Sequence, residues 1–448
     1  MKIDRRSLHS THSRSLPKSA AVSEFQVPGT MRIDEAGVVL HPDLKPYVRV
    51  SGCTDDHLAH LDSGFTVAFL GTGASLSPFR SQTSSALRMG GKTFLFDAGD
   101  GVQRQLMMSS VNLGEIEKIF ITHLHGDHVF GLPGLLLFLQ VIASVQQLED
   151  KTIQIYGPVG LHNFIATTLS LGAAELKILR VEVYELMGGS CRWRHPGVQK
   201  NFSEFRHRGL IRKSIPKNAD GTWTIMTPPE VNTVEEAERT HSSRYRGLYI
   251  TAAEVEHTPK LQCVGYVVEE PKTQSINIDS EKATSIGLKP SRKYKALKWG
   301  FPVLSDDESR MIQPEEVMIG EKGKPRKLAI LGDCYAVPQV MANLCRGADV
   351  ILHENTLSEE NSDAKVMIGG HSSAAMAGMF VNEVNPHVLA LVHHSPTVRN
   401  ASSVRARIAE ANRQIKRKGT RVLFADDLME LVVPRSGFDF NASMVTKE

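Results

Sequence analysis

The sequence is poor in several features that would mark a particular class of protein. It has five cysteines in 448 residues, an odd number with no Cys-x-x-Cys pair, which argues against a disulfide framework and favours a reducing compartment. Its formal net charge is only +3, so any contact with nucleic acid must come from local basic patches. No apolar run reaches the ~20 residues of a membrane span. We therefore expect an intracellular protein that does not contact a membrane.

The first 62 residues are expected to form a partly disordered extension. Residues 1–23 are rich in Ser, Arg and Lys and contain one acid, Asp4. That composition is typical of an organelle transit peptide, and a plain disordered tail has the same composition. The compartment therefore stays open between the cytoplasm or nucleus and an organelle, either mitochondrion or plastid. Residues 435–448 are expected to be a C-terminal tail.

Residues 63–434 have the pattern of one large α/β domain. Short apolar strands come first, two of them joined by Gly90-Gly91, which is a hairpin signal. Strands that alternate with helices follow, and this order predicts two mixed sheets covered by helices. Two polar stretches, 186–246 and 271–325, interrupt the pattern and are expected to be insertions.

The densest chemistry follows an apolar strand that is predicted to end near residue 122. Residues 122–128 read Thr-His-Leu-His-Gly-Asp-His. In an extended backbone, residues two apart point to the same side, so His123 and His125 can bind one cation. Asp127 and His128 stand where the chain turns into the next apolar run and can bind a second. Nitrogen and oxygen ligands at this density favour zinc or a similar divalent metal over a surface histidine cluster.

Three further candidate ligands stand at the predicted ends of later strands. They are His257, Asp333 and His393. Ligand sites collect at such positions in layered α/β folds, and the glycine before Asp333 lets the backbone approach closely. A single strand-end His or Asp is usually a cap or turn residue, so the interpretation depends on all three together.

The pattern His-x-His-x-Asp-His after a strand resembles the metallo-β-lactamase superfamily. The wider match over residues 119–135 resembles one branch, ribonuclease Z, the tRNA 3′-end endonuclease, in its short eukaryotic or plant-type form. The resemblance implies a four-layer αβ/βα sandwich with an inserted arm, two zinc ions per subunit and a homodimer. By the same resemblance, one zinc is held by His123, His125 and His257, the other by Asp127, His128 and His393, and Asp333 bridges them.

Two further boxes resemble that family. Residues 353–356, His-Glu-Asn-Thr, resemble its His-Glu-Ala-Thr box, and residues 371–373, His-Ser-Ser, resemble its His-Ser-Thr box. In the family the histidine of the His-Ser-Thr box protonates the leaving oxygen, and the glutamate of the His-Glu-Ala-Thr box orients that histidine. Here these roles fall to His371 and Glu354. Asp127 would orient the attacking water. The alternative for His371 is a histidine at a helix N-terminus without chemistry.

The inserted arm of the family clamps precursor tRNA, and it lies between His257 and Asp333. In this chain residues 286–300, within that region, carry five basic residues and no acid, as contact with a phosphate backbone requires: Lys289, Arg292, Lys293, Lys295 and Lys298. A charged surface helix is the alternative. The stretch 186–246 combines basic and aromatic residues, which favours either an RNA-contacting surface or a solvated insertion.

The chain departs from the family in two loops. The family's Pro-x-Lys-x-Arg-Asn loop, near the 3′ end of the substrate, reads Ser-Pro-Phe-Arg-Ser at 77–81. Arg80 survives as an expected substrate contact, but the missing Asn leaves discrimination against mature CCA ends undetermined. After the last ligand, His-His-Ser-Pro at 393–396 replaces His-x-Ser-x-Arg-Tyr.

The sequence thus favours a zinc endoribonuclease that removes 3′ trailers from precursor tRNA. The alternative is a dinuclear metallo-hydrolase of small phosphodiesters or other esters, with the arm as a dimer contact. A catalytically silent RNA-binding homologue is a third class, and the complete ligand set argues against it.

Overall fold

The computed structural model describes most of the chain between residues 42 and 440. The described residues are 42–50, 64–148, 150–190, 207–229, 233, 236, 247–271, 277–319, 324–360, 366, 369–435, 437, 438 and 440. The transit-peptide hypothesis for residues 1–23 and the aromatic part of the basic stretch, within 191–206, lie outside them.

The first of two large sheets has nine strands in the order β1-β20-β2-β3-β4-β5-β6-β7-β8. Their bounds are Val48–Val50 (β1), Phe65–Gly71 (β2), Ser84–Met89 (β3), Lys92–Phe96 (β4), Ile116–Phe120 (β5), Thr152–Pro158 (β6), Arg180–Met187 (β7), Leu210–Pro216 (β8) and Met429–Val432 (β20). β2, β3 and β4 are antiparallel, and β4 to β8 are parallel. The predicted hairpin is confirmed: Gly90 and Gly91 join β3 to β4 with φ of 58° and 78°.

The second sheet has seven strands in the order β19-β18-β17-β16-β11-β10-β9. Their bounds are Thr222–Met226 (β9), Tyr249–Glu254 (β10), Val264–Glu269 (β11), Lys327–Ile330 (β16), Val350–Asn355 (β17), Val388–His394 (β18) and Arg421–Phe424 (β19). β16 to β19 run parallel. Parallel strands place all their carboxyl ends at one edge, and the predicted ligands follow such ends.

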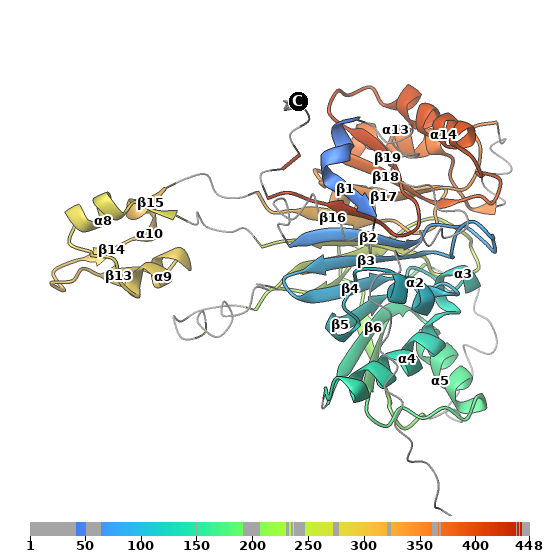
Figure 1. The fold of residues 1–448 in the computed structure, drawn as a ribbon, viewed down its shortest axis with the longest axis horizontal. Helices are drawn as coiled ribbons and strands as arrows, with labels where there is room; N and C mark the ends of the chain where they lie inside the picture. Colours follow the sequence, from blue (N-terminus) through green and yellow to red (C-terminus); the bar gives the residue numbers. More distant parts are fainter. Residues whose placement is uncertain are drawn as a thin grey trace, which may run out of the picture.

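Helices cover the outer faces of both sheets (Figure 1). The first sheet packs against Val102–Met108 (α2), Leu132–Val145 (α4) and Leu161–Leu171 (α5); the second packs against Gln339–Cys345 (α11), Ala374–Val384 (α13) and Ala401–Gln414 (α14). The inner faces share one apolar core that includes Phe96, Phe120 and Tyr266. This arrangement is the four-layer αβ/βα sandwich that the sequence predicted.

Residues 277–319 form a small separate lobe, here called the arm, that projects from the sandwich (Figure 1). Its elements are Asn277–Ile278 (β12), Ser280–Ser285 (α8), Lys293–Lys298 (α9), Val303–Leu304 (β13), Met311–Ile312 (β14), Pro314–Val317 (α10) and Met318–Ile319 (β15). The arm has its own core of Ala283, Leu288, Leu297, Ile312 and Val317. It lies within the stretch 271–325 that the sequence marked as inserted.

The other polar stretch, 186–246, contributes a strand to each of the two large sheets. β8 forms one edge of the nine-stranded sheet and β9 one edge of the seven-stranded sheet. Edge strands leave alternate side chains in water, so β8 carries few buried residues and gives only a weak apolar signal. The two ends of the chain also contribute to the sandwich: β1 pairs with β20, and Phe438 packs edge-on against Tyr47 with ring centroids 5.0 Å apart.

One stretch meets the length and composition of a membrane span, contrary to the expectation from the sequence. It runs from Gly126 to Val145 and covers Gly126–Val129 (α3) and α4. Half of that stretch is buried inside the protein, and Leu132, Leu135, Leu136 and Leu139 pack in the core beneath the first sheet. The stretch therefore fits a core helix that positions the neighbouring metal motif.

Candidate metal centre and active site

A buried carboxylate, Asp97, shapes the turn that carries the first ligands. It follows β4 with φ of 58°, and its two oxygens accept hydrogen bonds from N–H and Oγ1 of Thr122 at 2.7 and 2.9 Å. Oδ2 of Asp97 also lies 2.8 Å from Nδ1 of His128. Asp97 therefore fixes the chain after β5 and turns Nε2 of His128 towards the site. The sequence analysis missed this residue, although it directly follows a strand.

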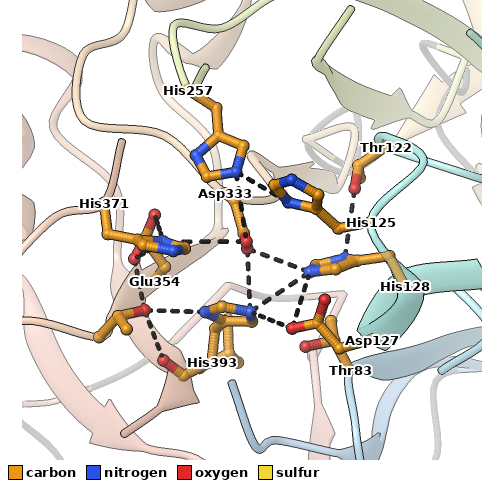
Figure 2. A network of polar contacts seen from close by, with 12 residues as sticks. Thr83, Thr122, His125, Asp127, His128, His257, Asp333, Glu354, His371 and His393 are labelled. Carbon is orange, nitrogen blue, oxygen red and sulfur yellow. Dashed lines mark hydrogen bonds and ion pairs between the residues drawn. The ribbon is translucent and has the colours of Figure 1, made fainter. Parts of the chain in front are cut away.

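The first ligand group joins three imidazoles from two sheets. His123 and His125 follow β5, and His257 follows β10; their ligand atoms and one from Asp333 lie within 4.8 Å of one another. Figure 2 shows His125, His257 and Asp333 of this group. Nδ1 of His125 is 2.9 Å from Nε2 of His123 and 3.1 Å from Nε2 of His257. Tetrahedral zinc with bonds of about 2.0–2.1 Å separates its ligands by roughly 3.3 Å, so these spacings suit one zinc ion.

The second group lies beside the first and consists of Asp127, His128 and His393. Nε2 of His393 is 3.3 Å from both Nε2 of His128 and Oδ2 of Asp127. Asp333 lies between the groups: Oδ1 is 3.2 Å from His393 Nε2, and Oδ2 is 3.7 Å from His123 Nε2. The structure thus brings together all seven residues that the sequence proposed as ligands.

A buried carboxylate oxygen of Asp333 indicates that these residues fit a cation. Among the described residues, Oδ1 of Asp333 accepts no hydrogen bond although it is buried, which is costly unless another partner exists. Burial lowers the pKa of His123 well below its usual value and lowers that of His125 to about 4, so both imidazoles offer lone pairs at neutral pH. Burial opposes ionisation of Asp333, but His128 and His393 hold its pKa well below the usual value. His123 and His125, with free lone pairs and an ionised carboxylate beside them, are donors of the kind that zinc binds.

Contacts behind the ligands fix their orientation. Nδ1 of His257 donates to the carbonyl of Gly370 at 2.5 Å, and Nδ1 of His393 lies 2.8 Å from Oγ1 of Thr356. A Cβ at Gly370, where φ is 71°, would stand 2.4 Å from the carbonyl oxygen of His257, so only glycine permits this approach. Both contacts leave Nε2 of the imidazole directed at the centre, as metal ligation requires.

His393 itself has φ of 55°, unusual for a residue other than glycine. The register between β17 and β18 shifts beside it, and the side chain of His394 points away from the metal centre. Nε2 of His394 contacts the carbonyl of Ala425 at 2.6 Å, and its ring stacks on Phe424 at 3.7 Å. The irregular backbone thus turns only the first of the two histidines towards the metals.

A histidine–glutamate pair lies on the open side of the centre. Nδ1 of His371 is 3.1 Å from both oxygens of Glu354, and Glu354 is fully buried. N–H of Cys334 and Oγ1 of Thr356 donate to that carboxylate at 2.8 and 2.6 Å. Burial alone would lower the pKa of His371, but its hydrogen bond to Glu354 and that group's charge raise the pKa to about 9. The arrangement therefore keeps a proton on His371 at neutral pH.

Two of the residues predicted to contact substrate have partners inside the protein. Arg80 is buried: its Nε donates to Oδ1 of Asp426 at 2.8 Å and its Nη1 to the carbonyl of Val398 at 2.6 Å, so its guanidinium is used inside the protein. In the arm, Nζ of Lys293 donates to the carbonyl of Leu304 at 2.9 Å and approaches Oδ1 of Asp306 at 3.3 Å, which gives it a structural role. The other four predicted arm residues are exposed: Lys289, Arg292, Lys295 and Lys298.

Comparisons with known proteins agree with this geometry. The human "Zinc phosphodiesterase ELAC protein 1" is 33% identical over 381 residues, which cover 82% of this chain and 98% of that protein. The chain belongs to the ribonuclease Z family of zinc phosphodiesterases, in the metallo-β-lactamase superfamily. A "Ribonuclease Z" of Methanothermobacter thermautotrophicus is 32% identical over 368 residues, 82% of this chain and 96% of the relative.

The structural comparison gives the same family. The crystal structure of human tRNase Z, short form (ELAC1), is 27% identical, has a TM-score of 0.52, and matches 82% of this chain and 99% of that one. A family model described as anti-Pycsar protein Apyc1 matches residues 65–176. That range contains residues 122–128, the first metal motif of this ribonuclease Z homologue.

Changing Asp97 to alanine is expected to weaken zinc binding by about 10–100-fold, because His128 loses the carboxylate that orients it. Zinc affinity, measured by competition with a chromogenic chelator, checks this. The control is Asp97→Asn, which can still accept one hydrogen bond from Thr122 and should retain more affinity than the alanine variant. Unchanged affinity in Asp97→Ala would show that the backbone alone holds His128.

Proposed function

We propose that this chain is an endoribonuclease that removes 3′ trailers from precursor tRNA with two zinc ions. The proposal of two zinc ions per chain rests on the two ligand groups, which Asp333 joins. His123, His125 and His257 would hold one ion, Asp127, His128 and His393 the other, and Asp333 both. When bound, the ions would supply a water of lowered pKa and would neutralise charge on the phosphate.

The chain's own residues divide the remaining work. Asp127 is partly exposed and lies 3.3 Å from His393, so it can orient the attacking water and accept its proton. His371 carries a proton at neutral pH because of Glu354, and it is in position to donate that proton from its imidazole to the departing 3′-oxygen. Glu354 holds the imidazole in place and is itself fixed by Cys334 and Thr356.

The tRNA substrate is supported by the family and by the arm. A centre of this kind also serves other hydrolases, so the choice depends on features away from it. The arm folds around its own core and projects from the sandwich (Figure 1). It carries the four exposed basic side chains named above. A projecting lobe with a local cluster of basic residues at 289–298 suits the backbone of a large folded RNA. A small phosphodiester would have no use for it.

Removing the arm's four exposed charges should therefore weaken binding of precursor tRNA and flatten its dependence on salt. The variant changes Lys289, Arg292, Lys295 and Lys298 to alanine and keeps Lys293, which supports the arm. Each lost phosphate contact should reduce the slope of log affinity against log salt by roughly one unit. Hydrolysis of bis(p-nitrophenyl) phosphate should stay unchanged.

A charge-matched control removes four exposed basic residues around α14: Arg405, Lys416, Arg417 and Lys418. It should bind precursor tRNA like the unaltered protein. Equal losses in both variants would mean that total charge, and not the arm, attracts the substrate. An unaffected arm variant would favour the alternative function, a hydrolase of small phosphodiesters.

The direct test of the function is cleavage of a precursor-tRNA transcript by the zinc-loaded protein, with the product mapped to the nucleotide. Cleavage next to the discriminator base supports the proposal, and turnover of small phosphodiesters alone refutes it. We also propose that the protein works as a homodimer, as its family leads us to expect. Sedimentation of the full chain tests this, and a monomer at the concentrations used for turnover would refute it.

A further inference from the structure

Two loops that leave the metal centre meet at an aromatic–guanidinium pair, Phe79 and Arg399. The guanidinium carbon of Arg399 lies 5.6 Å from the centroid of the Phe79 ring. Arg399 is exposed and Phe79 is half-buried. Both loops are the places where the chain departs from the pattern of its family. The pair belongs neither to the metal centre nor to the arm.

Arg80 explains why the two side chains stand together. It follows Phe79 and donates from Nη1 to the carbonyl of Val398, the residue before Arg399, at 2.6 Å. Both side chains of its ion pair with Asp426 are buried, so the guanidinium that joins the two loops is held in place. Ser81 adds a second tie, because its N–H donates to Oδ2 of Asp427 at 2.7 Å. The residue expected to contact substrate thus positions its neighbours.

The loop that carries Phe79, residues 74–83, also lies next to the metal centre at both of its ends. At the start, N–H of Ala74 donates to the carbonyl of His394 at 3.0 Å. At the end, Thr83 lies beside Asp127 and His393 (Figure 2). Thr83 stands four positions after Phe79, and four residue steps span at most about 14 Å. The pair therefore lies within reach of nucleotides next to the scissile phosphate.

We propose that Phe79 and Arg399 form a stacking platform for one unpaired nucleobase of the RNA substrate beside the cleavage site. The inference rests on the proposed function and adds specificity-determining residues to it. Single-stranded RNA is recognised by stacking of splayed bases on aromatic rings and on guanidinium planes. Nε of Arg399 donates to the carbonyl of Pro396 at 2.8 Å, which holds the guanidinium over the ring before any base arrives.

The platform makes a specific demand on the substrate. Every base has a π-face, so stacking depends on the presence of a base and little on its identity. The platform would therefore select for an unpaired nucleotide at one position, and it would tolerate varied trailer sequences. A base held in a duplex could not reach the ring, so cleavage would be confined to the junction of the acceptor stem and the single strand.

The test compares intact precursor tRNA with transcripts that carry a single abasic nucleotide at successive positions around the cleavage site. The zinc-loaded full chain should lose roughly 5- to 150-fold in kcat/KM at one position, the cost of one stacked base. Phe79→Leu should lose the same factor on intact substrate and nothing further on that abasic substrate. Phe79→Trp, which keeps a stacking surface, should restore cleavage.

Three outcomes would overturn the platform. In the first, Phe79→Leu cleaves intact substrate as well as the unaltered protein does. In the second, the loss caused by Phe79→Leu adds in full to the loss on every abasic substrate, as a folding defect would. An unaltered protein that turns over small phosphodiesters but no precursor tRNA would overturn the proposed function and the platform with it. Either of the first two outcomes, on a precursor tRNA that the unaltered protein cleaves, would overturn the platform and leave the proposed function in place.

Discussion

Replacing Asp333 with alanine is expected to abolish phosphodiester hydrolysis and to weaken both zinc sites at once. Its two oxygens face different ligand groups, one towards His393 and the other towards His123. Losing a partner that only orients a ligand costs about 10–100-fold in metal affinity, and losing a shared ligand should cost more. Zinc content after dialysis, together with turnover of precursor tRNA and of bis(p-nitrophenyl) phosphate, measures the effect.

Asp127→Ala provides the informative contrast. Asp127 belongs to only one ligand group, so its loss should weaken one site, leave the other occupied, and still stop hydrolysis. A matched control is Asp349→Asn: Asp349 is also buried and accepts a hydrogen bond from N–H of Lys327 at 2.8 Å, away from the metals. It should keep zinc and turnover. Near-normal turnover by Asp333→Ala would refute the dinuclear mechanism.

The sequence predicted the metal centre well because the information there is local. His123, His125, Asp127 and His128 lie within six residues, and the period of an extended strand was enough to group the first two. The remaining ligands stand at ends of strands, and parallel strands bring such ends to one edge. The family resemblance then supplied the grouping, and the structure brings all of these residues together.

Residues whose role depends on distant partners were not predictable in the same way. Arg80 was expected to contact substrate, but its partner Asp426 stands 346 positions further along the chain. Asp97 was overlooked because its contact with His128 spans 31 positions. Lys293 resembles its basic neighbours in sequence, and only the fold of the arm shows that it is tied to Asp306. In each case the contacts that the fold creates, and not residue type, decide the role.

Edge strands were the second kind of failure. β8 and β9 lie at the margins of their sheets, where one row of side chains faces water. Their polar residues read as loop, because sequence patterns detect a strand through apolar side chains that a sheet buries. The same effect hid β1, which is three residues long and pairs only with β20.

Replacing His371 with alanine is expected to slow hydrolysis by about 10²–10⁴-fold while zinc stays bound. This is the usual contribution of a general acid. The side chain of His371 lies 3.1 Å from Glu354 and 3.8 Å from Asp333, and it is close enough to His393 to be considered as a ligand instead. Zinc content separates the two roles: a variant that loses zinc in proportion to activity would identify His371 as a ligand.

The pH profile tests the same residue independently. Glu354 raises the pKa of His371 to about 9, against the effect of burial, so the proton is present below that pH and is lost as pH rises through it. Hydrolysis should therefore decline on the alkaline side, and bound zinc, which adds positive charge, should place the decline below pH 9. Glu354→Gln removes the charge that raises the pKa and should move the decline to lower pH, whereas His371→Ala should lack it. A decline that persists unchanged in His371→Ala would assign it to another group, and the general acid would have to be sought elsewhere.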